Sequence, residues 1–444
     1  MTSGQRLERD LPRILDELAV SPYPDYIDSV LAVAAQRRQR PPWTFPERWL
    51  SMSTLTARTA SVPRTPLRIA AIVALLLIAL AVGAALLVGS RRPLPAPFGP
   101  AVNGLVAYAT NGDIYTVDPR TGVSHAIVTG PETDINPRWS RDGTHIAFER
   151  KAQGDSGPGF VYVARADGSD PIKMATAASL ADIFDYKFSP DGTQLLISYG
   201  VGADRIVDYG VLPSGNWAVL IASTDGTAVR SLDIGDPTPD IAWRPPLGHE
   251  LMFMDADDGS SACCAIHLVS ADGRAPRTIL GPRPFRSRAH PSWSPDGSLI
   301  AFDEWDPSAA AWTVQTHIIK ADGTEERTLP TPPGATWQAF ESWSNDGTRL
   351  LVFRGYHQDQ TGAQPVVVSV DGTQPEVPIT VPGVTFSPTE THTWEWAPDD
   401  SYILGTPDGG SAALPQVMLD PVKGTSRTLP WTSVSLPSTQ RNAP

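Results

Sequence analysis

A short phrase recurs six times between residues 138 and 405 of this 444-residue chain. Four close copies are RWSRDGTHIAF at residues 138–148, KFSPDGTQLLI at 187–197, SWSPDGSLIAF at 292–302 and SWSNDGTRLLV at 342–352. Two looser copies are AWRPPLGHELMF, which ends at Phe253, and EWAPDDSYILG, which ends at Gly405. The aromatic residue before the turn recurs at intervals of 49, 55, 50, 50 and 53 residues. A period near 50 residues with several short strands in each unit predicts a β-propeller.

The residues of the phrase have physical roles in a hairpin. In SPDG, Pro pre-sets φ at the first central position of the turn, Asp bonds backbone amides, and Gly takes the open conformation at the exit. A second turn with Asp and Gly follows in each unit, as in VARADGS around Asp167. We expect the aromatic residues before the first turn to pack between blades as structural elements. They are Trp139, Phe188, Trp243, Trp293, Trp343 and Trp396.

The number of blades follows from comparing the two kinds of turn. The aromatic phrase occurs six times, but the second turn occurs seven times, because YTVDPRTG adds one near the start. Residues 104–128 therefore supply three strands without an opening strand, and LPWTSVSLP at 429–437 would return the missing one. Such closure removes exposed sheet edges. We expect an all-β propeller of seven four-stranded antiparallel blades over residues 101–436, followed by a tail at 437–444. Six blades are the alternative, if the first three strands only complete the last blade.

One segment has the composition of a membrane span. Residues 69–89, IAAIVALLLIALAVGAALLVG, are apolar or small and carry no charge. At about 1.5 Å per residue, a helix of this length crosses a hydrocarbon core of roughly 30 Å. A buried core helix and a cleaved signal peptide are the alternatives, but 68 largely polar residues precede this segment. We predict a single transmembrane helix.

Charge on the two sides of this segment predicts its orientation. Residues 1–68 carry ten Arg and seven acidic residues, whereas residues 69–444 carry 25 basic and 41 acidic residues. The positive-inside rule favours a cytoplasmic amino terminus, with the propeller on the other side of the cell membrane. The Pro-rich residues 90–100 would act as a semi-rigid linker. The acidic balance of the large domain argues against a nucleic-acid partner.

The amino-terminal segment, residues 1–68, is predicted to be helical. Its first helix would place five apolar residues on one face: Leu7, Leu11, Ile14, Leu15 and Leu18. A second helix is predicted to begin at Asp25, and two short helices are too little to bury an independent core. The segment would therefore dock a cytoplasmic protein partner or lie against the membrane. The alternative is a basic tail that only sets topology.

The repeat resembles that of a known group. The WSPDGxxIAF and ADG phrases are similar to the WD40-like (PD40) repeat of TolB-type proteins, which also occurs in propeller domains of prolyl-oligopeptidase-like peptidases. The resemblance covers roughly residues 101–430 and implies a β-propeller. It implies little about function. TolB carries an α/β domain before its propeller where this chain has the apolar segment, so the TolB role is not implied. The sequence also holds no hydrolase-sized segment and no G-x-S-x-G elbow.

The sequence offers few candidates for catalysis or metal binding. Its eight histidines are scattered singly, and we expect no cofactor and no catalytic residue. DADDGSS places Asp255, Asp257 and Asp258 near one another, which makes a weak calcium candidate without EF-hand spacing. Cys263 and Cys264 are adjacent, so a strained vicinal disulfide or a pair of buried thiols is expected, and the pair of thiols is preferred.

The loops that do not repeat are the remaining candidates for binding. Turns between strands one and two and between strands three and four must share one rim, so the variable connections between strands two and three lie on the opposite rim. Variable loops on a rigid scaffold commonly carry binding, although they can simply tolerate change. The candidate binding residues there are Tyr199, Asp204, Arg205, Tyr209, Trp217, Trp305, Trp312, Tyr356 and His357.

These observations predict a membrane-anchored, extracytoplasmic propeller that binds or senses a ligand without catalysis. The ligand would be a protein, a peptide or a glycan, and the propeller could relay binding to a cytoplasmic partner of residues 1–68. Three alternatives stay open: an anti-sigma-like membrane regulator, a hydrolase or lyase with a site in the propeller channel, and a scaffold within an envelope complex.

Overall fold

The computed structural model describes residues 99–442 with internal gaps. The gaps are residues 153–158, 175–179, 202–205, 208–209, 212–216, 236, 238–239, 256–263, 307, 310–312, 357–362, 383–393 and 407–413. The predicted cytoplasmic segment, the predicted transmembrane helix at 69–89 and nearly all of the predicted linker lie outside the described residues. No helix in the described part of the chain has the length and apolar character of a membrane span.

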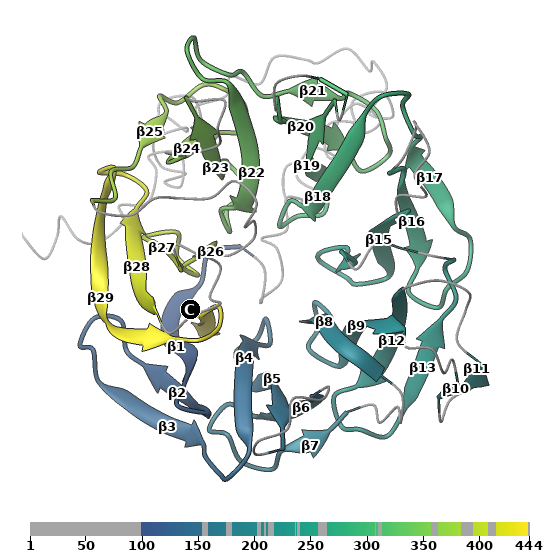
Figure 1. Cartoon of the computed structure of the whole chain (residues 1–444), viewed down its shortest axis with the longest axis vertical. Helices are drawn as coiled ribbons and strands as arrows, with labels where there is room; N and C mark the ends of the chain where they lie inside the picture. The colour runs from purple at the N-terminus through teal and green to yellow at the C-terminus, as the bar shows by residue number, and fades with distance from the viewer. Residues whose placement is uncertain are drawn as a thin grey trace, which may run out of the picture. The chain divides into compact units, whose positions relative to one another are not determined.

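The described strands form seven four-stranded antiparallel sheets around a common centre, which confirms the seven-bladed prediction (Figure 1). From the inner to the outer strand, the first three blades are blade A, β30 (Ser438–Asn442), β1 (Val102–Thr110), β2 (Asp113–Val117) and β3 (Ser124–Val128); blade B, β4 (Thr133–Trp139), β5 (His145–Lys151), β6 (Phe160–Arg165) and β7 (Ile172–Lys173); and blade C, β8 (Leu180–Phe188), β9 (Gln194–Val201), β12 (Trp217–Ser223) and β13 (Val229–Leu232). A small hairpin, β10 (Ile206–Val207) with β11 (Gly210–Val211), lies between β9 and β12 in the chain.

The other four blades each use four strands in chain order. They are blade D, β14 (Ala242–Trp243), β15 (Glu250–Met254), β16 (Ile266–Ser270) and β17 (Arg277–Leu280); blade E, β18 (Ser287–Trp293), β19 (Leu299–Trp305), β20 (Gln315–Lys320) and β21 (Arg327–Thr328); blade F, β22 (Trp337–Trp343), β23 (Arg349–Gly355), β24 (Gln364–Ser369) and β25 (Val377–Pro378); and blade G, β26 (Trp394–Trp396), β27 (Ile403–Gly405), β28 (Leu414–Asp420) and β29 (Thr425–Ser433).

The ring closes through blade A, which takes strands from both ends of the domain. β30 pairs antiparallel with β1, with Val106 opposite Thr439 and Ala107 opposite Ser438. The closing strand therefore lies within residues 437–444, which the sequence analysis assigned to a tail. Most of LPWTSVSLP instead belongs to β29, the outer strand of blade G, because blade G needs its fourth strand before the chain can return to the centre. The six-bladed alternative is wrong.

Serine and aspartate together close the repeated turns between inner strands. In blade E, Ser294 Oγ donates to Asp296 Oδ1 at 2.6 Å, and Asp296 accepts the main-chain amide of Ser298 at 3.0 Å. The main-chain amide of Leu299 then donates to Ser294 Oγ at 2.9 Å. Blades B, C and F contain the same Ser-to-Asp bond at 2.6 Å. The phrase therefore specifies a hairpin whose polar groups are satisfied locally.

The core lies between adjacent blades. Trp243 of blade D packs with Leu196, Val219 and Ile221 of blade C, and its indole N–H donates to the main-chain oxygen of Lys187 at 3.2 Å. The middle strands are buried along most of their length because a neighbouring blade covers each face. The five tryptophans of the repeat are buried in this way, and Phe188 is half-buried against its cluster. Their positions are those of packing elements.

Candidate functional site

The inner strands run in the same direction in every blade, so the ring has two distinct rims. We call the rim with the first and third turns of each blade the turn rim, and the opposite one the loop rim. Residues before the repeat aromatic lie toward the loop rim, and the residues of the Ser-x-Asp-Gly turn lie on the turn rim. Both rims carry charged side chains near the centre of the ring.

The structure describes four of the nine predicted binding residues of the loop rim, and they differ in burial. Tyr199 is completely buried in the core between blades B and C, and burial raises the pKa of its phenol, so it presents no surface for binding. Trp305 is half-buried against a core cluster, whereas Tyr356, which follows β23, is 41% exposed. Trp217 begins β12. Outside the described residues lie Asp204, Arg205, Tyr209, Trp312 and His357.

The weak metal candidate gains no support in the described residues. Asp255 lies 2.9 Å from Nε2 of His267, while Asp257 and Asp258 lie outside the described residues. No group of three or more His, Cys, Asp or Glu side chains with the arrangement of a metal site occurs in the described part of the chain. Cys264 is disulfide-bonded rather than a free thiol, and the sequence contains only one other cysteine, Cys263.

Charge pairs on the inner two strands were missed by the sequence analysis. Arg150 of β5 makes two bonds to the buried Asp134 of β4, at 2.7 and 2.8 Å. In blade E the signs are reversed, because Arg288 of β18 donates to Glu304 of β19 at 2.9 Å. In each pair, one residue lies five positions before the repeat Trp and its partner lies eleven positions after it. That fixed offset, with opposite charges at its two ends, was a sequence signal that could have revealed them.

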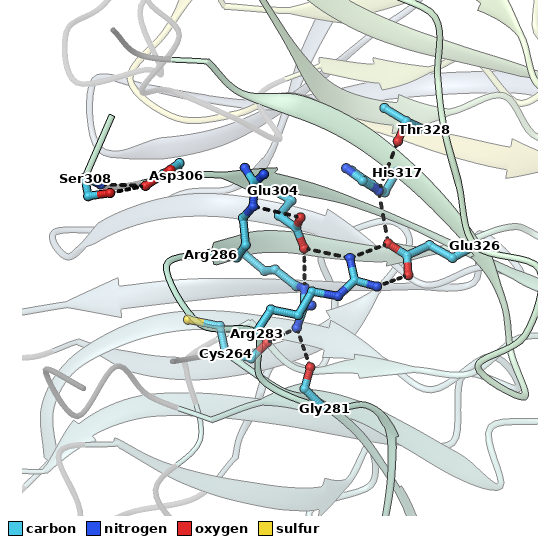
Figure 2. A network of polar contacts seen from close by, with 11 residues as sticks. Cys264, Gly281, Arg283, Arg286, Glu304, Asp306, Ser308, His317, Glu326 and Thr328 are labelled. Carbon is cyan, nitrogen blue, oxygen red and sulfur yellow. Dashed lines mark hydrogen bonds and ion pairs between the residues drawn. The ribbon is translucent and has the colours of Figure 1, made fainter. Parts of the chain in front are cut away.

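The blade E pair is part of a larger network on the side that faces blade D. Figure 2 shows Arg283 between the carboxylates of Glu304 and Glu326, which it contacts at 3.5 and 2.5 Å. Glu326 also lies 3.1 Å from Nδ1 of His317. Arg288 donates to the main-chain oxygen of Cys264 at 3.3 Å, which ties this network to the disulfide. Each carboxylate of this network has an arginine partner, as expected for charges that fix the junction of two blades, although Nη2 of Arg288 makes no hydrogen bond within the described residues.

A cavity of about 180 Å³ lies at the centre of the ring, toward the loop rim. β4 contributes Asn136 and Arg138, and β5 contributes Glu149. The remaining walls are residues 183–186 of β8 and residues 434–436, which lead into the closing strand. Phe184 lines the cavity and is 53% exposed. Two blades and the closing segment thus build one charged and partly open hollow.

Most polar groups around this cavity already have partners. Glu149 forms an ion pair with Lys151 at 3.3 Å, and Asp185 forms one with Lys187 at 3.0 Å. Burial acts to raise the pKa of Asp185, but Lys187 and Arg138 outweigh that effect and hold the pKa below its usual value. Tyr186 donates its hydroxyl to the main-chain oxygen of Asn136, and burial raises its pKa well above the ordinary value.

The turn rim also carries a polar cluster, where the sequence analysis expected only scaffold residues. Arg141 and Asn345 occupy the turn position that is Pro in SPDG, and Arg441 lies in the closing strand β30. The three side chains meet although their blades are B, F and A. Asn345 Oδ1 accepts from Arg441 at 2.8 Å and from Arg141 at 3.4 Å. Its main-chain amide donates to Asp400 of blade G at 2.7 Å. A cavity of about 150 Å³ adjoins this cluster.

Comparisons with known proteins add little beyond this geometry. No protein-family model matches the chain, and no curated protein matches it. Among solved structures, a putative TolB from Agrobacterium tumefaciens is similar at 17% identity and a TM-score of 0.42, covering 64% of this chain and 90% of that one. An oligogalacturonate lyase in complex with manganese has 14% identity and a TM-score of 0.37, covering 74% of this chain and 95% of that one.

A puromycin-hydrolyzing peptidase of Mycobacterium tuberculosis is similar at 17% identity and a TM-score of 0.47. The likeness covers 77% of this chain, which spans only 57% of the peptidase. These three proteins differ in function, and the identities are too low to transfer an activity, a substrate or a partner. The seven-bladed architecture therefore rests on the strand pairing itself, and a β-propeller is the fold that the resemblance to TolB-type repeats implies.

Proposed function

We propose that this chain is a single-pass membrane protein whose propeller binds a ligand outside the cytoplasm without changing it chemically. The observation that carries this proposal is the central cavity of about 180 Å³, which two blades and the closing segment line with charged side chains. Cavities on the axis of a rigid ring hold their lining groups in place and favour binding. The proposal assigns residues 1–68 to the cytoplasm, 69–89 to the membrane and 90–100 to a linker.

The state of the lining groups favours binding over catalysis. A general acid or base works best with a pKa near the operating pH and a free path to the reacting proton. The lowered pKa of Asp185 keeps it ionised at neutral pH, and Lys187 holds its carboxylate. Tyr186 has a raised pKa and donates to a main-chain oxygen. Neither group is prepared for proton transfer.

The topology can be tested with single cysteines in the full chain. Both native cysteines are replaced by serine, and one cysteine is introduced at Thr54 or, in the exposed turn of blade F, at Thr373. A membrane-impermeant maleimide added to intact cells should label the Thr373→Cys chain but not the Thr54→Cys chain, which becomes labelled after lysis. Labelling of Thr54→Cys alone in intact cells would show the opposite orientation and overturn the proposal.

Binding can be tested by filling the cavity. Val434 lines the cavity and is half-buried, so Val434→Phe should occupy part of it. Val123→Phe, at a site that is 54% exposed, is the matched control. Polar small molecules, peptides and oligosaccharides that raise the unfolding temperature of the full chain should lose this effect in Val434→Phe only. Mass spectrometry should recover the ligand unchanged, because a changed ligand would instead establish the hydrolase or lyase alternative.

The anti-sigma-like alternative rests on the apolar helical face of the amino-terminal segment. If this segment holds a cytoplasmic protein, Leu11→Asp and Leu15→Asp in the full chain should release that protein while ligand binding by the propeller is kept. A full chain that co-purifies with no cytoplasmic protein, or that keeps its partner in both variants, would count against this alternative.

A further inference from the structure

Arg138 is a positive charge near the centre of the ring that acts on Asp185 and Glu395 only at a distance. It stands on the inner strand β4, directly before Trp139, and it lines the central cavity while half-buried. Among the described residues, its guanidinium has no hydrogen bond and no ion pair within 4 Å. Burying part of an arginine without a partner costs free energy, so a group of opposite charge in the cavity would be favoured there.

The neighbouring charges leave Arg138 as the unmatched one. Glu149 and Asp185 are the two carboxylates that line the cavity, and each has its own lysine, Lys151 or Lys187. After these two pairs are formed, the lining residues of the cavity retain one positive charge, that of Arg138, and the nearby carboxyl of Glu395 in blade G is buried with a raised pKa. This balance suits a ligand group with a single negative charge. A dianionic group such as phosphate would meet stronger repulsion from the two carboxylates.

A second polar group faces the same space from the closing segment. Ser435 lines the cavity, is only 3% exposed, and its hydroxyl has no hydrogen-bond partner within the described residues. Its main-chain amide is already used, because it donates to Ser433 Oγ at 3.2 Å. A buried hydroxyl without a partner is uncommon, since leaving it unpaired costs about 1–3 kcal/mol. Ser435 therefore supplies an unpaired hydroxyl in the lining of the same cavity as Arg138.

We propose that Arg138 and Ser435 form a binding site for a carboxylate group, which gives the ligand class of the proposed function on which this inference rests. A planar guanidinium matches the two oxygens of a carboxylate, and the serine hydroxyl adds a third donor. The cavity of about 180 Å³ has room for a carboxylate with a short chain behind it. Phe184 lies at its wall as an apolar contact for that chain. The carboxylate comes from a small organic acid or from the end of a polypeptide.

Fluorine NMR of the full chain in nanodiscs can detect such a site even when binding is weak. The probe is trifluoroacetate, and trifluoroacetamide is its uncharged counterpart. The wild-type protein should broaden the trifluoroacetate signal and leave the amide signal sharp. Arg138→Gln should weaken the apparent affinity at least tenfold, and Ser435→Ala should weaken it by a smaller factor. Arg120→Gln, at a side chain that is 86% exposed in blade A, should match the wild type.

Competition separates the two sources of the carboxylate. Acetate and the peptide acetyl-Ala-Ala-Ala are added in turn, with the carboxy-terminal amide of the same peptide as the uncharged form. Displacement by the peptide acid at much lower concentration than by acetate assigns the site to a polypeptide terminus, and the reverse order assigns it to a small organic acid. Equal broadening by wild type and Arg138→Gln, or none by wild type, would overturn the carboxylate site.

Failure of this inference differs from failure of the proposed function. If trifluoroacetate does not bind but an uncharged ligand still stabilises the wild type and not Val434→Phe, only the carboxylate assignment is wrong. If the maleimide labels the cytoplasmic and propeller cysteines in the opposite order, the proposed function fails whatever the NMR result. Folding of Arg138→Gln is checked by its unfolding temperature, and Arg138→Lys, which keeps the charge but loses the planar fork, should retain part of the affinity.

Discussion

Arg441 in the closing strand β30 donates through Nη1 to Asn345 Oδ1 at 2.8 Å, and this bond joins residues 96 positions apart in the chain. Asn345 in turn holds Asp400 of blade G, so three blades and the closing strand meet at one amide side chain. Burial, and next the nearby Arg441, lower the pKa of Arg141, the other arginine of the cluster, to about 9. The hydrogen bonds of this cluster on the turn rim therefore connect blades B, F and G to the closing strand.

Replacing Arg441 should lower the stability of the propeller. Arg441 is 6% exposed, and Arg441→Met would leave Asn345 Oδ1 with only the longer bond from Arg141. We expect a loss of about 3 kcal/mol in the free energy of unfolding. Hydrogen bonds to charged groups contribute ~1.5–3 kcal/mol, and a buried acceptor that loses its donor adds a further cost. Urea unfolding followed by tryptophan fluorescence measures it. Arg274→Met, at an 86% exposed side chain, should change stability by less than about 1 kcal/mol.

Glycines in the repeated turns should differ in their tolerance of a side chain. Gly297 and Gly372 both have positive φ, +68° and +72°. A Cβ on Gly297 would lie 2.0 Å from the main-chain oxygen of Pro245 in blade D, whereas a Cβ on Gly372 would meet nothing within 4 Å. Gly372→Ala should therefore cost only the conformational strain of about 1–2 kcal/mol. Gly297→Ala should cost clearly more, and equal unfolding midpoints for the two variants would show that the turn does not pack against blade D as described.

The buried charge pair of blade B should show strong coupling. Asp134 is fully buried and its partner Arg150 is 18% exposed. Each single substitution, Asp134→Asn or Arg150→Gln, therefore leaves the other group without its charged partner. A double-mutant cycle should give a coupling free energy of about 2 kcal/mol or more. The same cycle on Asp118 and Arg120, an exposed pair, should give only ~0.2–1 kcal/mol. Similar values for the two pairs would mean that burial at β4 adds nothing to the interaction.

The repeated turn aspartates should make the propeller sensitive to acid. Burial acts to raise the pKa of Asp296, but bonds from Ser294 and Ser298 outweigh it, so the pKa lies below the ordinary value. Asp142, Asp191 and Asp346 behave in the same way. A lowered folded pKa contributes stability that is present above the unfolded pKa of about 3.9 and is lost as pH falls through the folded pKa.

Stability should therefore decline below about pH 4, because that is where the unfolded aspartates take up protons before the folded ones. Urea unfolding midpoints between pH 7 and pH 2.5 measure this decline. Asp296→Asn should be less stable at pH 7 and should show a shallower decline below pH 4. An unchanged slope in that variant would show that Asp296 contributes nothing to the acid response.

Much of the fold could be predicted from the chain because its repeat is local. The Ser-x-Asp-Gly turn satisfies its own polar groups within five residues, so the hairpin and its period are visible without tertiary contacts. The closing strand was misplaced because STQRN lacks the phrase, and its pairing with β1 is decided some 335 residues away. Tyr199 was taken for a surface residue because its position at the end of β9 does not reveal that blade B covers it.

The candidate site was harder to predict than the scaffold. Arg138 precedes a repeat aromatic residue, as five other residues do, and the amino-acid sequence does not show that its neighbours Glu149 and Asp185 are neutralised by lysines. Those pairings depend on two blades and the closing segment meeting at the centre of the ring. Ser435 has no sequence signature at all.

The amino-acid sequence by itself determined the seven blades, the hairpin turns and the aromatic packing between blades, because each depends on contacts within one repeat or between successive repeats. Only the tertiary structure decided which strand closes the ring, that Arg141, Asn345 and Arg441 meet at the turn rim, and that Arg138 faces a cavity without a partner. The physical reason is ring closure: it brings together residues that are 204 and 297 positions apart in the chain, and no local preference encodes which of them will meet.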